Sequence, residues 1–291
     1  MRIPVLPASA LVLNALVWGV SWWPFRELQS HGLHPLWATT IIYAFSLLCL
    51  LAVRPGAWRG LIQHPQLWFL VAASGLANVG FNWAVTEGDV VRVVLLFYLM
   101  PAWVVLLAWP LLGERPTASS LSRLALALLG LVIVLKAPGA DWPLPSSLAD
   151  WLALMGGFCF ALTNILLRRL TQVSSESRVF GMFWGGALLS TAVAAAGMQL
   201  GVIAAPPAPG LVWVGLAVLV SLAFLAGNLG LQYGASNLPA NTTSLIMLSE
   251  VVFASLSAVL LGAGELTTRT MIGGGLIVLA ALLAAGSSQK S

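Results

Sequence analysis

A single acidic residue, Glu250, lies within an apolar stretch that is long enough to cross a membrane. A charged carboxylate near the middle of such a span costs at least ~2.5 kcal/mol. No lysine or arginine lies at comparable depth in a predicted span, so the group is either protonated or in a wet cavity. Three roles fit it: a carrier of protons, a ligand for the amino group of a substrate, or a hydrated structural residue near the inner mouth of the span.

Amide and aromatic residues recur in pairs four positions apart, a spacing that places both members on one face of a helix. The stretch that starts NVGFNWAV at Asn78 corresponds to the stretch NLGLQYGA at Asn228, about 150 positions later. WGVSWWPFR near the N-terminus aligns in the same way with FALTNILLR. The matched pairs are Trp18 and Trp22 with Phe160 and Asn164, and Asn78 and Asn82 with Asn228 and Gln232.

These residues can contact a small zwitterion, because rings offer flat apolar surface and amides pair with amino and carboxyl groups. Pro101 should kink its span, and such a break is tolerated where it lines a cavity. The alternative is that the amides only join helices, at about 0.6–2 kcal/mol each, and that Trp103 fills a packing or lipid-facing position. We predict one substrate-binding cavity lined by Trp18, Trp22, Asn78, Asn82, Tyr98, Trp103, Phe160, Asn164, Asn228, Gln232, Tyr233 and Glu250.

The composition indicates an integral membrane protein. Hydrophobic residues make up 59% of the chain and charged residues 8%, against about 25% charged in soluble domains. Long unbroken apolar runs favour helices over a β-barrel, so we predict an all-α membrane protein whose surface contacts the lipid bilayer. The net charge of +4 is divided among short loops and does not indicate nucleic-acid binding.

Charge gaps and Pro/Gly breakers divide the chain into ten predicted transmembrane helices, arranged as two inverted five-helix repeats. Residues 1–137 form the first repeat and 138–291 the second, within one membrane unit. The N-terminal stretch resembles a signal peptide, but it is long enough to span and has a later counterpart, so we take it as the first helix. The predicted spans are 6–25, 35–53, 66–86, 91–112, 119–136, 148–167, 179–201, 210–235, 239–262 and 268–287.

The basic residues predict the orientation, because cytoplasmic loops are enriched in lysine and arginine. With both termini in the cytoplasm, nine of the 13 basic residues fall inside. We therefore expect a multi-pass protein with both termini in the cytoplasm, and we treat it as a monomer. The nine residues are Arg2, Arg54, Arg59, Arg115, Arg123, Arg168, Arg169, Arg178 and Lys290.

A membrane-embedded enzyme is the main alternative class. All three histidines fall in predicted loops, and the chain has no HExxH, nucleophile-elbow or Walker A pattern. Cys49 and Cys159 lie apart in apolar spans, which is typical of small hydrophobic residues rather than of a disulfide or metal site. We therefore expect no catalytic residue, cofactor or metal. A channel is also possible, although filter-like repeats and charged rings are absent.

The duplicated pattern resembles the EamA-type branch of the drug/metabolite transporter superfamily, and within it the YddG-type aromatic amino-acid exporters. The resemblance rests on LLGERPT and LGAGELT at the ends of the fourth and ninth spans, on SEVVFASLSAVLLG, and on LRRL after the sixth. It implies a secondary transporter of the bacterial inner membrane that exports small metabolites, with the substrate held between the two halves. An amino acid, aromatic or otherwise neutral, is the favoured substrate, and a multidrug or cation efflux carrier is the alternative. Met100 stands opposite Glu250, so a proton-linked role would rest on one half only.

Overall fold

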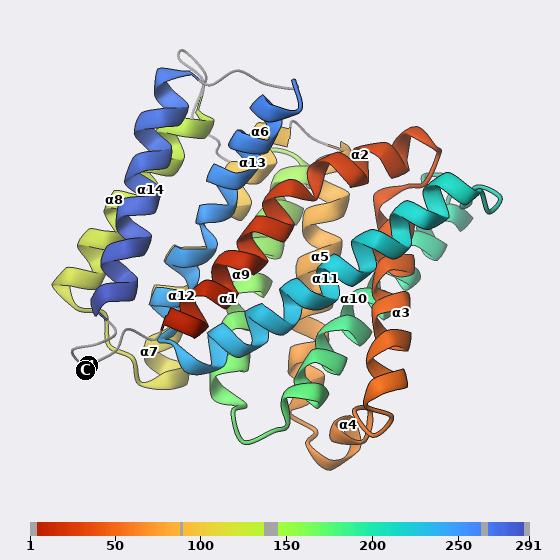
Figure 1. The fold of residues 1–291 in the computed structure, drawn as a ribbon, viewed down its shortest axis with the longest axis horizontal. Coiled ribbons are helices and arrows are strands. Elements are labelled where there is room, and N and C mark those ends of the chain that lie inside the picture. Colours follow the sequence, from red (N-terminus) through yellow and green to blue (C-terminus); the bar gives the residue numbers. More distant parts are fainter. Residues whose placement is uncertain (1–4, 88–89, 137–144, 263–266, 288–291) are drawn as a thin grey trace.

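The computed structural model describes residues 5–87, 90–136, 145–262 and 267–287, and these residues form helices and connections without a strand. Figure 1 shows how the helices cross one another in a single bundle. They are α1 (Val5–Val20), α2 (Trp22–Ser30), α3 (Pro35–Val53), α4 (Arg59–Gln63), α5 (Leu67–Glu87), α6 (Val90–Phe97), α7 (Met100–Leu112), α8 (Ala118–Leu135), α9 (Leu148–Arg169), α10 (Ser175–Gln199), α11 (Leu211–Asn237), α12 (Ala240–Met247), α13 (Ser249–Leu260) and α14 (Thr268–Ser287).

Short polar segments set the helix ends. Ser147 begins α9 with a capping box, in which its hydroxyl accepts from the backbone N–H of Asp150 while the Asp150 carboxylate accepts from the backbone N–H of Ser147. These contacts satisfy backbone donors that have no partner inside the helix. Gly113 ends α7 with a φ of 75°, a left-handed conformation that costs a glycine little.

Eight helical segments are long and apolar enough to cross a membrane, so the predicted all-helical, multi-pass architecture is confirmed. The helices α8 and α14 are also apolar and occupy the predicted fifth and tenth spans, but their described apolar parts are shorter. The total of ten spans therefore stays a prediction. The predicted boundary between the halves, at residues 137 and 138, lies outside the described residues.

Two spans are broken at corresponding positions. The fourth span divides into α6 and α7 at Tyr98 and Leu99, and Pro101 lies in the first turn of α7. The predicted kink at Pro101 is therefore confirmed, since proline cannot donate the backbone hydrogen bond that would continue the helix. The ninth span divides into α12 and α13 at Leu248, without a proline. The sequence offered no signal for this second break.

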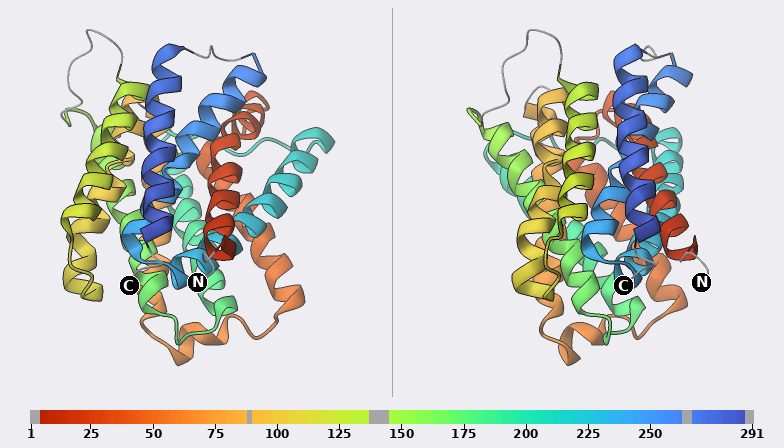
Figure 2. Two further views of the ribbon diagram at one scale, coloured as in Figure 1. Left: turned by 60° about the vertical axis from the view of Figure 1, so that its left-hand side comes forward. Right: turned by 90° about the vertical axis from the view of Figure 1, so that its left-hand side faces the viewer.

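The two predicted halves pack on each other throughout the bundle. The helix α5 packs against α9 and α10, while α1 packs against α11, and α8 and α14 lie side by side at one edge in Figures 1 and 2. Contact between α5 and α10 requires a glycine, because a Cβ atom on Gly185 would overlap the carbonyl oxygen of Val71. The short helix α4 lies at one end of the bundle, called the α4 end below, which is the predicted cytoplasmic end.

Candidate functional site: a cavity between the two halves

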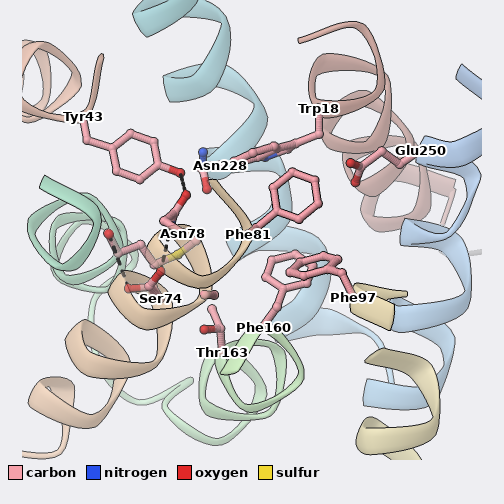
Figure 3. Close-up of a pocket in the computed structure, with 12 residues that line it drawn as sticks. Trp18, Tyr43, Ser74, Asn78, Phe81, Phe97, Phe160, Thr163, Asn228 and Glu250 are labelled. Atoms are coloured by element: carbon pink, nitrogen blue, oxygen red, sulfur yellow. Dashed lines mark hydrogen bonds between the residues drawn. The ribbon is translucent and has the colours of Figure 1, made fainter. Parts of the chain in front are cut away.

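A small cavity lies where helices of both predicted halves meet (Figure 3). Its volume open to the centres of water molecules is about 40 Å³, enough for about three waters but not for an amino acid. A molecule as large as an amino acid would fit only in a wider cavity. Its lining residues are Trp18, Tyr43, Ser74, Ala77, Asn78, Phe81, Phe97, Phe160, Thr163, Met182, Asn228 and Glu250.

Hydrogen-bonding groups gather on one side of the cavity. The Tyr43 hydroxyl of α3 donates to Oδ1 of Asn78 at 3.0 Å, and it also interacts with the side chain of Asn228. Asn78 Nδ2 donates to the carbonyl of Ser74 at 2.8 Å, and Asn228 Nδ2 donates to the carbonyl of Phe224 at 2.9 Å. The two corresponding asparagines are thus held in the same way, each by the carbonyl four residues earlier.

Aromatic rings line the middle part of the cavity. The centroids of Phe81 and Phe97 are 4.7 Å apart, and Phe97 stacks on Phe160 with centroids 5.9 Å apart. Trp18 lies on the opposite helix, α1, beside the Asn228 and Glu250 side chains in Figure 3. This belt gives a substrate apolar contact and, above a ring face, attraction for a positive charge.

The carboxylate of Glu250 lies on the other side of the rings from the Tyr43 hydroxyl (Figure 3). Glu250 lies just after the break between α12 and α13. Its side chain interacts with Tyr98, which lies at the corresponding break between α6 and α7. Helix α1 approaches here so closely that a Cβ atom on Gly19 would lie 2.7 Å from the Glu250 carbonyl oxygen. No lysine or arginine is among the described lining residues, so the carboxylate is the one formal charge among them.

The structure brings part of the predicted set together. Trp18, Asn78, Phe160, Asn228 and Glu250 line the cavity, from both halves of the chain. Tyr98 does not line the cavity, but it interacts with the Glu250 side chain. Its ring meets the Phe97 ring edge-on, with centroids 5.5 Å apart.

The remaining members of the set lie elsewhere and mostly join helices. Trp22 Nε1 donates to Ser257 Oγ at 2.9 Å. Asn82 Nδ2 donates to Thr39 Oγ1 at 2.5 Å, and Asn164 Nδ2 contacts the Met100 sulfur at 3.9 Å. The contacts of the two amides, Asn82 and Asn164, match the alternative role of joining helices.

Trp103, Gln232 and Tyr233 are also absent from the cavity lining. Trp103 meets Phe158 edge-on with centroids 5.7 Å apart, in the predicted packing role. Gln232 donates to Ser236 at 3.2 Å, towards the α4 end, and Tyr233 is 39% exposed on the outside of α11. For Gln232, the four-residue spacing from Asn228 indicated a shared helix face but not which neighbour the side chain contacts.

Sequence reasoning missed several lining residues. Ser74, Ala77 and Phe81 lie on the same face of α5 as the predicted Asn78, a spacing that the sequence does contain. Tyr43 had a weaker signal, as a lone tyrosine in an otherwise apolar span. Thr163 lies on the same face of α9 as Phe160, three residues away.

A polar cluster joins the helix ends on the α4 side of the cavity. We call it the Arg168 cluster: Glu114, Arg168, Arg178 and Ser236. Arg168 lies with its Nε 3.7 Å from Glu114 Oε1, and its Nη1 donates to the Ser236 carbonyl at 2.8 Å. Arg178 is buried and donates to Ser236 Oγ and, at 3.0 Å, to the Leu167 carbonyl. The cluster thus connects the ends of α9, α10 and α11.

Glu114 connects the predicted first half to this cluster. It follows the end of α7, and its Oε2 accepts from the backbone N–H of Ala240 at 3.1 Å, the first residue of α12. Burial raises the pKa of the Glu114 carboxyl, while the Ala240 N–H and Arg168 act in the opposite direction. A carboxylate here also satisfies a helix N-terminus that would otherwise lack a partner.

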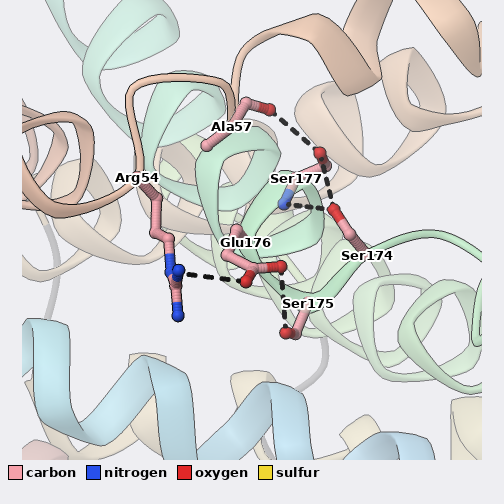
Figure 4. A network of polar contacts seen from close by, with 6 residues as sticks. All are labelled: Arg54, Ala57, Ser174, Ser175, Glu176 and Ser177. Carbon is pink, nitrogen blue, oxygen red and sulfur yellow. Dashed lines mark hydrogen bonds and ion pairs between the residues drawn. The ribbon is translucent and has the colours of Figure 1, made fainter.

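A second set of contacts fastens the connection between α3 and α4 to the start of α10 (Figure 4). Arg54 Nε lies 3.5 Å from Glu176 Oε1, and both side chains are at least one-third exposed. Ser177 Oγ donates to the Ala57 carbonyl at 3.0 Å. Such an exposed ion pair contributes little to stability, unlike the partly buried Arg168 cluster.

The family model of the EamA-like transporter family matches residues 6–136 and 147–286, nearly the whole described bundle. This chain belongs to that family. It is therefore a multi-pass membrane transporter with the two-repeat fold of EamA-like proteins.

Two further likenesses agree with this assignment. The chain is 31% identical over 128 residues to the uncharacterized transporter PA0485 of Pseudomonas aeruginosa, a match that covers 43% of this chain and 40% of that protein. A solved crystal structure shares the fold of this EamA-like transporter with a TM-score of 0.75, over 98% of each chain at 18% identity. That likeness shows the fold alone.

Proposed function

We propose that this EamA-like transporter exports small zwitterionic metabolites, most simply aromatic or other neutral amino acids, across the bacterial inner membrane. The substrate occupies the cavity between the two halves, and the halves rock around it so that each side opens in turn. The protein performs no chemical conversion. Both termini lie in the cytoplasm, as the distribution of basic residues predicts.

One observation carries this proposal: a carboxylate and a pair of amides lie on opposite sides of a belt of aromatic rings. An amino group fits beside Glu250, where the rings also favour a positive charge. The substrate carboxylate fits beside Asn78 and Asn228, whose amides donate hydrogen bonds. An apolar or aromatic side chain fits against Trp18, Phe81 and Phe160.

A thermal-shift panel on the purified protein tests this assignment with matched pairs of ligands. L-phenylalanine and 2-phenylethylamine differ only by the carboxylate, and L-leucine and 3-methylbutylamine form a second pair. The proposal predicts that the amino acids raise the melting temperature more than the amines. If only the amines do so, the amide side has no role in binding and the protein is a cation carrier.

The cation carrier is the second candidate because the described lining has one carboxylate and no basic residue to pair with a substrate carboxylate. Both candidates use Glu250, but in two possible ways. As an amine ligand, its replacement in Glu250→Gln abolishes binding. As a proton carrier, the same replacement leaves binding intact and removes the dependence of transport on a pH gradient. If transport and binding are both unchanged, Glu250 is structural.

A further inference from the structure

We propose that Tyr43 is a positioning residue that sets the substrate specificity of the cavity by fixing the orientation of Asn78 and Asn228. This inference rests on the proposed function and adds a residue to it that the sequence pairs do not contain. Tyr43 acts through its hydroxyl, which lies between the two corresponding asparagines, one from each half of the chain.

The surroundings of Tyr43 hold its ring in one place. A Cβ atom on Gly186 would overlap the ring, so the absence of a side chain there creates the slot in which the ring lies. The Phe183 ring packs edge-on against the Tyr43 ring, with centroids 5.2 Å apart. Tyr43 is 3% exposed, so its hydroxyl is shielded from bulk water.

The contacts of Asn78 show what this hydroxyl does. A neutral amide has two N–H donors and one acceptor oxygen. Asn78 Oδ1 already accepts from Tyr43, and one N–H already donates to the Ser74 carbonyl. Asn78 therefore has one N–H left to donate to a ligand, while its oxygen, which keeps a second lone pair, is turned towards Tyr43. An N–H donor pairs with a carboxylate oxygen and cannot pair with an ammonium group.

Without the hydroxyl, the amide of Asn78 loses the contact that directs its oxygen away from the ligand. Only the bond to the Ser74 carbonyl then holds the amide, and once that bond breaks the oxygen can turn towards the cavity, where it would meet a substrate carboxylate unfavourably. Asn228 loses its contact with Tyr43 in the same step, although its own bond to the Phe224 carbonyl remains. Tyr43 thereby favours ligands that carry a carboxylate over amines that lack one.

The test is Tyr43→Phe, which removes the hydroxyl and keeps the ring that fills the slot beside Gly186. Affinities for L-phenylalanine and 2-phenylethylamine are measured by calorimetry on wild type and variant. We expect Tyr43→Phe to weaken L-phenylalanine binding about tenfold, the effect of one buried hydrogen bond, and to change amine binding less than about twofold. Tyr233→Phe, on the outside of α11, is the matched control and should change neither affinity.

Equal weakening of binding for both ligands would mean that Tyr43 only supports the fold. Unchanged affinities for both would mean that its hydroxyl has no role. Either result overturns the inference. If wild type binds none of the amino acids or amines, the proposed function itself fails. Thermal melting of Tyr43→Phe, Asn78→Ala and the double variant then decides the contact without a ligand. We expect the double variant to lose less than the sum of the single losses, and additive losses would contradict the bridge.

Discussion

Removing Glu114 from the Arg168 cluster should shift the bundle towards a form that is open at the α4 end. Glu114 is the one member of the cluster from the predicted first half of the chain. Replacement by alanine removes the acceptor for the Ala240 N–H and the partner of the Arg168 guanidinium. Both contacts join the end of α7 to the second half on the α4 side of the cavity. If that end of the bundle must open during transport, Glu114→Ala favours the open form.

The size of the effect follows from the exposure of the groups. A hydrogen bond to a charged acceptor contributes about 1.5–3 kcal/mol when buried. The Glu114 and Arg168 side chains are 24% and 35% exposed, so we take the lower end, about 1.5 kcal/mol for both contacts together. That energy corresponds to roughly a tenfold increase in the open population.

A cysteine at Thr163 reports the opening. Thr163 lines the cavity, is 1% exposed and lies one turn of α9 before Leu167, whose carbonyl accepts from Arg178. With Cys49 and Cys159 replaced by alanine, a membrane-impermeant maleimide can react only with this cysteine. We expect Glu114→Ala to raise the reaction rate about tenfold in inside-out membrane vesicles and to leave it unchanged or lower in right-side-out vesicles.

Glu176→Ala is the matched control, since it removes the exposed ion pair with Arg54 at the same end of the bundle. Its labelling rate should stay within about twofold of the parent because exposed pairs contribute little. The reasoning is refuted if Glu114→Ala labels no faster than the parent, or if the control variant labels equally fast.

Three further predictions follow from other parts of the structure. Because burial raises the pKa of Glu114 in the folded protein, the folded state binds a proton there more readily than the unfolded chain. The melting temperature should therefore gain a contribution as the pH is lowered from neutral towards the ordinary pKa of a glutamate, a gain that Glu114→Gln lacks, and equal pH profiles would contradict this. Gly185→Leu should lower the melting temperature by at least about 5 °C, because α5 leaves no room for a side chain at this position, whereas Gly215→Ala, which has open space around it, should not lower it. Equal melting temperatures for the two variants would show that the contact between α5 and α10 can relax. Single cysteines near Arg59 and Arg169, at the start of α4 and the end of α9, should be labelled only from the cytoplasm, and labelling of either from outside would reject the predicted orientation.

The sequence predicted the helical bundle well because membrane spans are defined by a simple physical requirement, a long apolar run with its backbone bonded internally. It also predicted the kink at Pro101, since a missing N–H is visible in the sequence. The break at Leu248 could not be predicted, because no proline or glycine marks it in the sequence; in the structure both α12 and α13 pack against α1.

The cavity was predicted only in part, for a related reason. Four-residue spacing shows that Asn78 and Asn82 share a helix face, but not that Asn82 turns to Thr39 while Asn78 turns to the cavity. That difference depends on how α3 crosses α5. Tyr43 and Arg178 were missed because their roles come from contacts with distant segments, Asn78 and Ser236, that no local pattern indicates.

The central claim is that the cavity between the halves binds and carries a small zwitterion, and counterflow in proteoliposomes tests it most directly. Vesicles loaded with unlabelled L-phenylalanine are placed in labelled L-phenylalanine, with wild type and an Asn78→Ala, Asn228→Ala double variant reconstituted in equal amounts. We predict that wild type accumulates label well above protein-free vesicles, and that the folded double variant accumulates at most about a tenth as fast. Equal accumulation by the double variant, or none by wild type with any of the twenty amino acids, would contradict the claim.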